Sequence, residues 1–87
     1  IPYLLDVQAD LLDNLATRVI VPLVTASAIG KPAKYLNPQF EIRHATIFMS
    51  TAELAGVPVR VLGKKVGSLK DQRQEIIAAL DFLFIGF

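Results

Sequence analysis

Short runs of alternating apolar and polar residues cover the first two thirds of the chain. Residues 5–11 place apolar side chains at odd positions and polar ones at even positions, and residues 39–43 and 57–62 alternate in a similar way. This period of two is typical of a half-buried β-strand. Residues 17–24 are nearly all apolar and rich in β-branched side chains, which predicts a buried strand. We therefore expect strands at these four places.

Turn-forming residues separate the predicted strands. They occur at 13–14, 30–32 and 37–38. His44 and Ala45 would form a tight connection to a further strand at 46–51, followed by a loop or short turn at 52–56. Pro22 has no N–H for a strand ladder, so we expect it at an edge, a bulge or a strand end. Residues 25–34 fit no single pattern.

The last third of the chain changes to helical spacing. Ser68 is a suitable N-cap, and Asp71 three residues later completes an approximate capping box. We expect a helix over 69–85, with Gly86 as its C′ residue. Its apolar face would comprise Ile76, Ile77, Leu80, Leu83 and Phe84. The whole chain, 1–87, is thus predicted as one mainly β domain, a small antiparallel barrel or sheet with one C-terminal helix.

The most hydrophobic stretch of the sequence is its end, residues 82–87. Phe84 shares the apolar face of the predicted helix, whereas Phe82 and Ile85 lie off it. At least one large apolar side chain should therefore point toward another surface, either in a homodimer or on a foreign partner. A hydrophobic content of 53% and a mean hydropathy of +0.48 favour a homo-oligomer for so small a chain. The alternative is a well-filled barrel.

The amino-acid composition excludes several kinds of site and several classes of function. The absence of cysteine excludes disulfides, thiolate metal sites and a cysteine nucleophile, and suits the cytoplasm, where we expect the protein to act. A net charge of +1 gives no electrostatic case for a bulk nucleic-acid binder or a membrane-surface protein. The longest uncharged run, 19–30, is shorter than the ~20 residues that cross a bilayer. We expect no membrane association.

Candidate catalytic and metal-binding groups are sparse. His44 is the single histidine and lies in a predicted turn, and a metal site needs more ligands than this. Asp6, Asp10 and Asp13 most simply form a solvated strand face, with a partner-recognition face as the alternative. Arg60 and the pair Lys64-Lys65 are interpreted as ordinary surface, because no aromatic residues are interleaved with them. We expect no catalytic residue, no cofactor and no metal.

Several stretches, in order and at matching spacing, resemble the CcdB family of bacterial toxins. They are residues 6–13 followed by 18–23, then 35–38, 57–63 and 75–86. Family members begin with one further strand. Because this chain starts at Ile1-Pro2 without a methionine, we expect that first strand of the family to be missing from it. Its neighbour would then be an exposed edge.

The resemblance implies a fold and a function. CcdB proteins, like the related MazF toxins, are SH3-like barrels that form homodimers. They are the toxins of type II toxin–antitoxin modules, and they bind the A subunit of DNA gyrase and trap its cleaved-DNA complex without catalysing a reaction. A disordered CcdA-like antitoxin neutralises them. Contact with operator DNA is implied only through the toxin–antitoxin complex.

The same resemblance assigns the gyrase-binding residues. They are Ile85, Gly86 and Phe87, with Asp81 and Phe84 on the helix and Leu11 and Leu12 after the first strand. The best-known members end in Trp-Gly-Ile, and a tryptophan ring stacks on an arginine plane as Ile85 cannot. The alternatives are a weakened or non-toxic homologue that keeps dimer and antitoxin binding, or a MazF-like ribonuclease. The catalytic groups of such a ribonuclease would have to come from Arg43, His44 and Arg60, together with the three aspartates Asp6, Asp10 and Asp13.

Overall fold

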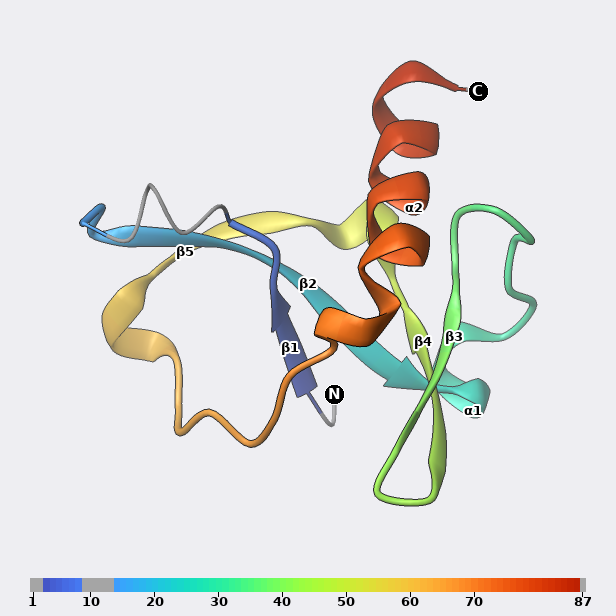
Figure 1. The fold of residues 1–87 in the computed structure, drawn as a ribbon, viewed down its shortest axis with the longest axis horizontal. Coiled ribbons are helices and arrows are strands. Elements are labelled where there is room, and N and C mark those ends of the chain that lie inside the picture. The colour runs from blue at the N-terminus through green and yellow to red at the C-terminus, as the bar shows by residue number, and fades with distance from the viewer. Residues whose placement is uncertain (1–2, 9–13, 87) are drawn as a thin grey trace.

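The computed structural model describes residues 3–8 and 14–86. These residues form an antiparallel sheet, curled into a half-barrel, with one long C-terminal helix across it (Figure 1). This arrangement confirms the predicted fold class. The strands are β1 (Tyr3–Asp6), β2 (Thr17–Thr25), β3 (Gln39–Ile42), β4 (Ala45–Met49) and β5 (Ala55–Pro58). The helices are α1 (Ala26–Ile29) and α2 (Arg73–Ile85), with short 3-10 turns η2 (Thr51–Glu53), η3 (Val59–Val61) and η4 (Lys70–Gln72).

Strand β2 is the centre of the sheet. Strand β1 pairs along one of its sides, from Tyr3 opposite Leu23 to Asp6 opposite Ile20. On the other side β5 pairs with the first part of β2 and β4 with the last part. Strand β3 then pairs with β4 at the far edge. Strand β2 therefore changes partner halfway along this second side.

Pro22 lies within β2, so the expectation of an edge, a bulge or a strand end was wrong. Its carbonyl accepts a 2.9 Å hydrogen bond from the Ser50 N–H, on the side of the sheet that β4 and β5 share. The N–H and C=O of one strand residue point to the same side. The N–H that proline lacks would therefore face the gap between β5 and β4, where no ladder bond is lost.

The β3–β4 connection is a two-residue turn, as predicted, but it lies one residue earlier. Ile42 pairs with Ala45, which leaves Arg43 and His44 as a two-residue loop. Both have positive φ, 51° and 68°. Two-residue hairpin loops of type I′ need positive φ at both positions, and Asn and Gly adopt it most easily. The Arg-His pair therefore gave no clear turn signal in the sequence.

Two other boundaries differ from the prediction. Strand β5 begins at Ala55 and ends at Pro58 opposite Thr17, the first residue of β2. Beyond that point no residue of β2 is left to pair with. The strand predicted over 57–62 therefore ends at Pro58, and the next three residues form η3. The first strand ends at Asp6 rather than continuing to Leu11, and residues 9–11 lie outside the described part of the chain.

Helix α2 starts later than predicted. The Ser68 hydroxyl accepts a 3.2 Å hydrogen bond from the Lys70 N–H, which leads into η4 rather than α2. Gln72 is the N-cap residue of α2 and makes no side-chain capping bond. The other end agrees with the prediction: Gly86 is left-handed at φ 83°, and its N–H donates to the Phe82 carbonyl at 2.9 Å.

The core lies between the sheet and α2. Its fully buried members come from the central strands and from one position of the helix: Val21, Leu23, Phe40, Ile47, Met49 and Ala79. Buried Thr51 donates its hydroxyl hydrogen to the Leu36 carbonyl, and the Asn37 side-chain amide donates to the Met49 carbonyl at 2.9 Å. These bonds fasten the loop before β3 to the core. None of the described helices is long and apolar enough to cross a membrane.

Candidate interaction surface at the end of helix α2

The apolar face predicted for the last helix is only partly covered. Ala79 is fully buried against the sheet, and Ile76, Leu80 and Leu83 are half-buried. Phe84, in contrast, is 69% exposed, and Ile77 is 41% exposed. The apolar stripe of α2 is thus wider than the surface on which it packs. The helix leaves a large aromatic ring uncovered near its end.

Phe82 is more covered than its position on the helix indicated. It lies off the apolar stripe, but its ring packs at 5.9 Å and 50° against Tyr35 in the loop before β3. The loop before β3 thus contacts α2 through this ring pair. Ile85, also off the stripe, is 62% exposed. The side chains that face outward are therefore those of Phe84 and Ile85.

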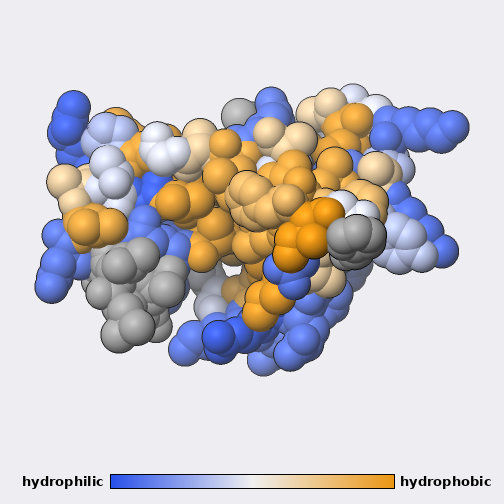
Figure 2. Space-filling view, turned by 90° about the horizontal axis from the view of Figure 1, so that it is seen from above, coloured by the Kyte–Doolittle hydropathy of each residue, from blue (hydrophilic) through white to orange (hydrophobic). Residues whose placement is uncertain are grey.

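An apolar groove of about 450 Å³ adjoins Phe84. Most of its lining is aliphatic or aromatic and comes from the end of β1, from β2, from the turn after η2 and from α2. The lining residues are Val7, Gln8, Leu15, Thr17, Val19, Leu54, Leu80 and Phe84. Seen from above, from the end where α2 stops, apolar side chains cover the middle of the molecule and hydrophilic ones its rim (Figure 2). Such a surface is typical of protein–protein contacts.

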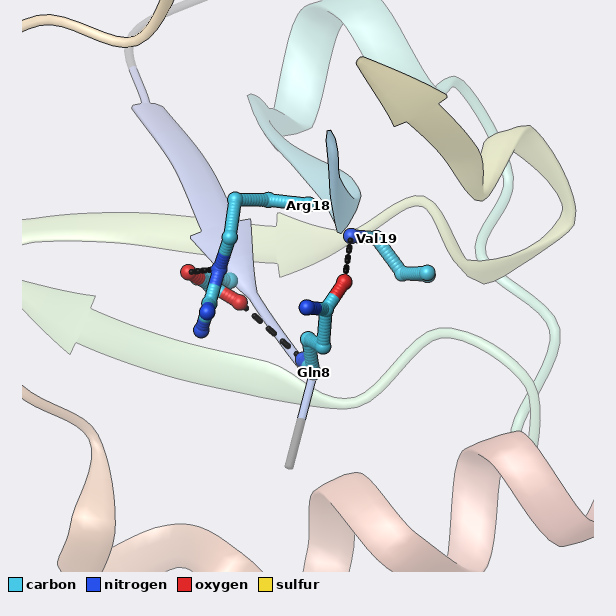
Figure 3. Close-up of polar contacts among 4 residues, drawn as sticks. Gln8, Arg18 and Val19 are labelled. Carbon is cyan, nitrogen blue, oxygen red and sulfur yellow. Dashed lines mark hydrogen bonds and ion pairs between the residues drawn. The ribbon is translucent and has the colours of Figure 1, made fainter. Parts of the chain in front are cut away.

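Polar contacts hold the end of β1 and Gln8 to β2, next to this groove (Figure 3). Arg18, with a side chain only 11% exposed, forms an ion pair at 2.7 Å between its Nε and Asp6 Oδ2. The other carboxylate oxygen of Asp6 accepts from the Gln8 N–H at 3.0 Å. Asp6 is thus a structural residue as well as part of an outer face. Asp10 and Asp13 lie outside the described residues.

Gln8 replaces the backbone at the next step of the ladder. The Val7 N–H donates to the Val19 carbonyl at 3.0 Å, as in a continued strand pair. The Val19 N–H, however, donates at 3.0 Å to Gln8 Oε1 instead of to a main-chain carbonyl. The side-chain amide thereby ends the β1–β2 pairing and leaves no orphaned donor. Val7, Gln8 and Val19 all line the groove, so this bond shapes the surface beside Phe84.

Gln8→Met should lower the free energy of unfolding by about 1–2 kcal/mol, because a part-buried N–H loses its acceptor while side-chain volume is kept. Gln8→Glu is the matched control, since it retains an acceptor at the same reach. Urea unfolding gives the energies, and amide hydrogen exchange at Val19 should accelerate in the methionine variant alone. Equal exchange in the two variants would contradict the assigned bond.

The structure gathers three of the predicted target-binding residues. Asp81, Phe84 and Ile85 are spaced three and four residues apart on α2, so they share one side of its last turns, and Gly86 caps them. All three side chains are exposed. Leu11, Leu12 and Phe87 lie outside the described residues. The sequence reasoning missed Leu15 and Ile77, which are 49% and 41% exposed, because it assigned Ile77 to the core and Leu15 to no element.

The groups named for ribonuclease chemistry are dispersed. Arg43 and His44 form the β3–β4 turn, and Arg60 lies on η3. The β3–β4 turn and η3 are on opposite sides of the molecule in Figure 1. Among the described residues no three His, Cys, Asp or Glu side chains are grouped so as to hold a metal ion.

Comparison with protein-family models matches residues 1–86 of the 87 to the family described as CcdB protein. The match spans all the described elements, from β1 to the capped end of α2. The half-barrel with one C-terminal helix agrees with the small SH3-like fold of that family. The chain therefore belongs to the CcdB family, and it is the toxin of a toxin–antitoxin system.

Proposed function

We propose that this toxin binds the A subunit of DNA gyrase and traps the enzyme's cleaved-DNA complex, which blocks replication. The observation that carries the proposal is the uncovered end of α2. Phe84 and Ile85 are 69% and 62% exposed on a helix that is firmly docked through Ala79. Rigid aromatic and aliphatic anchors of this kind dominate the energy of protein interfaces. The binding surface comprises Asp81, Phe84, Ile85 and Gly86 together with Phe87, Leu11 and Leu12.

The groove next to this surface bears on the first of the other proposed partners, a second copy of the chain. We expect a homodimer, because the groove beside Phe84 is apolar and too large to be left to water without cost. We also expect a CcdA-like antitoxin that removes the toxin from gyrase, and operator DNA contact only through the complex with that antitoxin. The action is non-catalytic, needs no cofactor and takes place in the cytoplasm.

Expression of the toxin without an antitoxin should stop growth and accumulate gyrase-linked DNA breaks, and co-expression of a cognate antitoxin should prevent both. Removal of residues 85–87 should abolish the arrest and leave the fold intact, because the helix is docked upstream at Ala79. Colony counts and isolation of gyrase–DNA complexes measure the two effects. Full toxicity of the shortened chain would exclude this end of α2 as the target-binding site.

Two other outcomes correspond to the alternatives. A chain that binds antitoxin tightly yet never arrests growth would be a non-toxic homologue, with Ile85 in the place of tryptophan as the first residue to test. RNA cleavage that is lost in His44→Ala would identify a ribonuclease toxin. The dispersal of Arg43, His44 and Arg60 over distant turns argues against that second outcome.

A further inference from the structure

The charges of the chain are segregated along the sequence. Five of the nine basic residues and one of the eight acidic residues fall within 59–73, so this stretch carries +4 and the rest of the chain −3. We call residues 59–73 the basic strap. It comprises η3, the irregular segment after it, η4 and the first residue of α2. The overall charge of +1 conceals this local concentration.

The cations of the strap are exposed, and none forms an ion pair with another described residue. They are Arg60, Lys64, Lys65, Lys70 and Arg73. Half-buried Leu62 and Leu69 hold the irregular segment at its two ends. From 63 to 67 the backbone makes no hydrogen bond to other described residues. The strap therefore offers both unpaired charges and unpaired peptide groups.

Exposed valines alternate with these cations. Val59, Val61 and Val66 are 44%, 57% and 54% exposed. No aromatic side chain occurs within 59–73. A nucleic acid would use the cations for its phosphates, but it would find no ring on which to stack a base and would gain little from the valines. A surface of alternating charge and apolar contact suits a polypeptide better.

The strap lies away from the uncovered end of α2. It runs along the lower left of the molecule in Figure 1 and joins α2 at its start, whereas Phe84 and Ile85 are at the opposite end of the helix. The 13 residues of α2 separate the two surfaces by ~20 Å. A partner on the strap can therefore be bound at the same time as one at the helix end.

We propose that the basic strap binds an extended peptide segment in which acidic and apolar side chains alternate. Its carboxylates would face the lysines and arginines, its apolar side chains would cover the valines, and its backbone would pair with the free peptide groups of 63–67. This inference goes beyond the proposed action on gyrase and does not depend on it.

The test uses the full chain and a fluorescent peptide of about 12 alternating Glu and Val residues, ~40 Å long when extended. Fluorescence anisotropy should show binding that weakens between about 50 and 300 mM NaCl. The double variant Lys64→Gln/Lys65→Gln should bind the peptide roughly five-fold or more weakly. Lys31→Gln/Lys34→Gln is the matched control, because it removes the same charge outside the strap and should bind like the unchanged chain.

Three results would overturn the proposal. The first is equal loss of binding in both double variants, which would reflect net charge alone. The second is equal binding of a peptide with Gln in place of Glu, which would point to the apolar groove. The third is tighter binding of a DNA duplex of matched charge, which would make the strap a nucleic-acid surface. Circular dichroism of each variant verifies that the fold is retained, and a growth assay separately reports the action on gyrase.

Discussion

Phe84→Ala should abolish growth arrest and weaken binding to the gyrase A subunit by roughly 30-fold or more, the effect of losing a central aromatic anchor. The ring is 69% exposed, so its removal should change the free energy of unfolding by only about 0.5 kcal/mol. Titration calorimetry with purified gyrase A subunit measures the affinity, and thermal unfolding measures the stability. A loss of affinity without a loss of stability separates target binding from folding.

Tyr35→Ala is the matched control for this experiment. Tyr35 is an aromatic residue of similar exposure, 63%, on the side of α2 where Phe82 packs. Its removal should leave gyrase binding unchanged. Ile85→Trp tests the same surface in the opposite direction and should strengthen binding by roughly ten-fold if the new ring stacks on an arginine. If Phe84→Ala and Tyr35→Ala were equally toxic, Phe84 would not belong to the target-binding surface.

Ala79→Asp should unfold most of the protein, because Ala79 is the fully buried contact through which α2 meets the sheet. A buried carboxyl group has its pKa raised by about 3–5 units, which corresponds to about 4–7 kcal/mol at neutral pH. A domain of this size has a total stability of the same order. Urea unfolding followed by circular dichroism measures the loss.

Ala78→Asp provides the control one position away. Ala78 is exposed on the same helix, so this change should cost only about 0.5 kcal/mol in helix propensity. The Ala79→Asp variant is most stable when its new, buried carboxyl group is protonated and therefore uncharged. The loss in free energy of unfolding relative to the unchanged chain should therefore be smaller near pH 4 than at pH 7. A carboxyl group whose folded-state pKa is raised costs stability as the pH rises above its unfolded pKa of ~3.9. Equal stability of the two variants would mean that α2 does not dock through Ala79.

The pattern of apolar and polar residues predicted correctly those elements that are determined by their own residues. Strand β2 was expected over 17–24 and spans Thr17–Thr25, because a continuous run of β-branched residues suits a strand buried on both faces. The end of α2 at Gly86 followed from the need for a residue that tolerates positive φ. The family itself was recognisable from stretches that stand in the same order along the chain, and the family match over 1–86 confirms it.

Where predictions from that pattern were wrong, the cause was the pairing of strands that are distant in sequence. The alternation over 57–62 predicted one strand, yet β5 stops at Pro58 because β2 begins opposite it at Thr17. Pro22 is tolerated inside β2 because its side of the strand faces the gap between β5 and β4. Neither fact can be read from the residues concerned, since each depends on where a distant strand begins or ends.

The sequence by itself determined that this small chain is mainly β with one helix in its last third and that residues 82–87 are too apolar to be simply solvated. Helical spacing could not say which apolar side chains of that helix are covered, because coverage depends on segments far away in the sequence. The loop that brings Tyr35 onto Phe82 partly covers a side chain that the spacing left outside. The limited width of the half-barrel leaves Phe84 exposed although the spacing placed it inside. Spacing alone therefore left open whether Phe82 or Phe84 is available to a partner; the resemblance pointed to Phe84, and the tertiary structure leaves the Phe84 ring exposed.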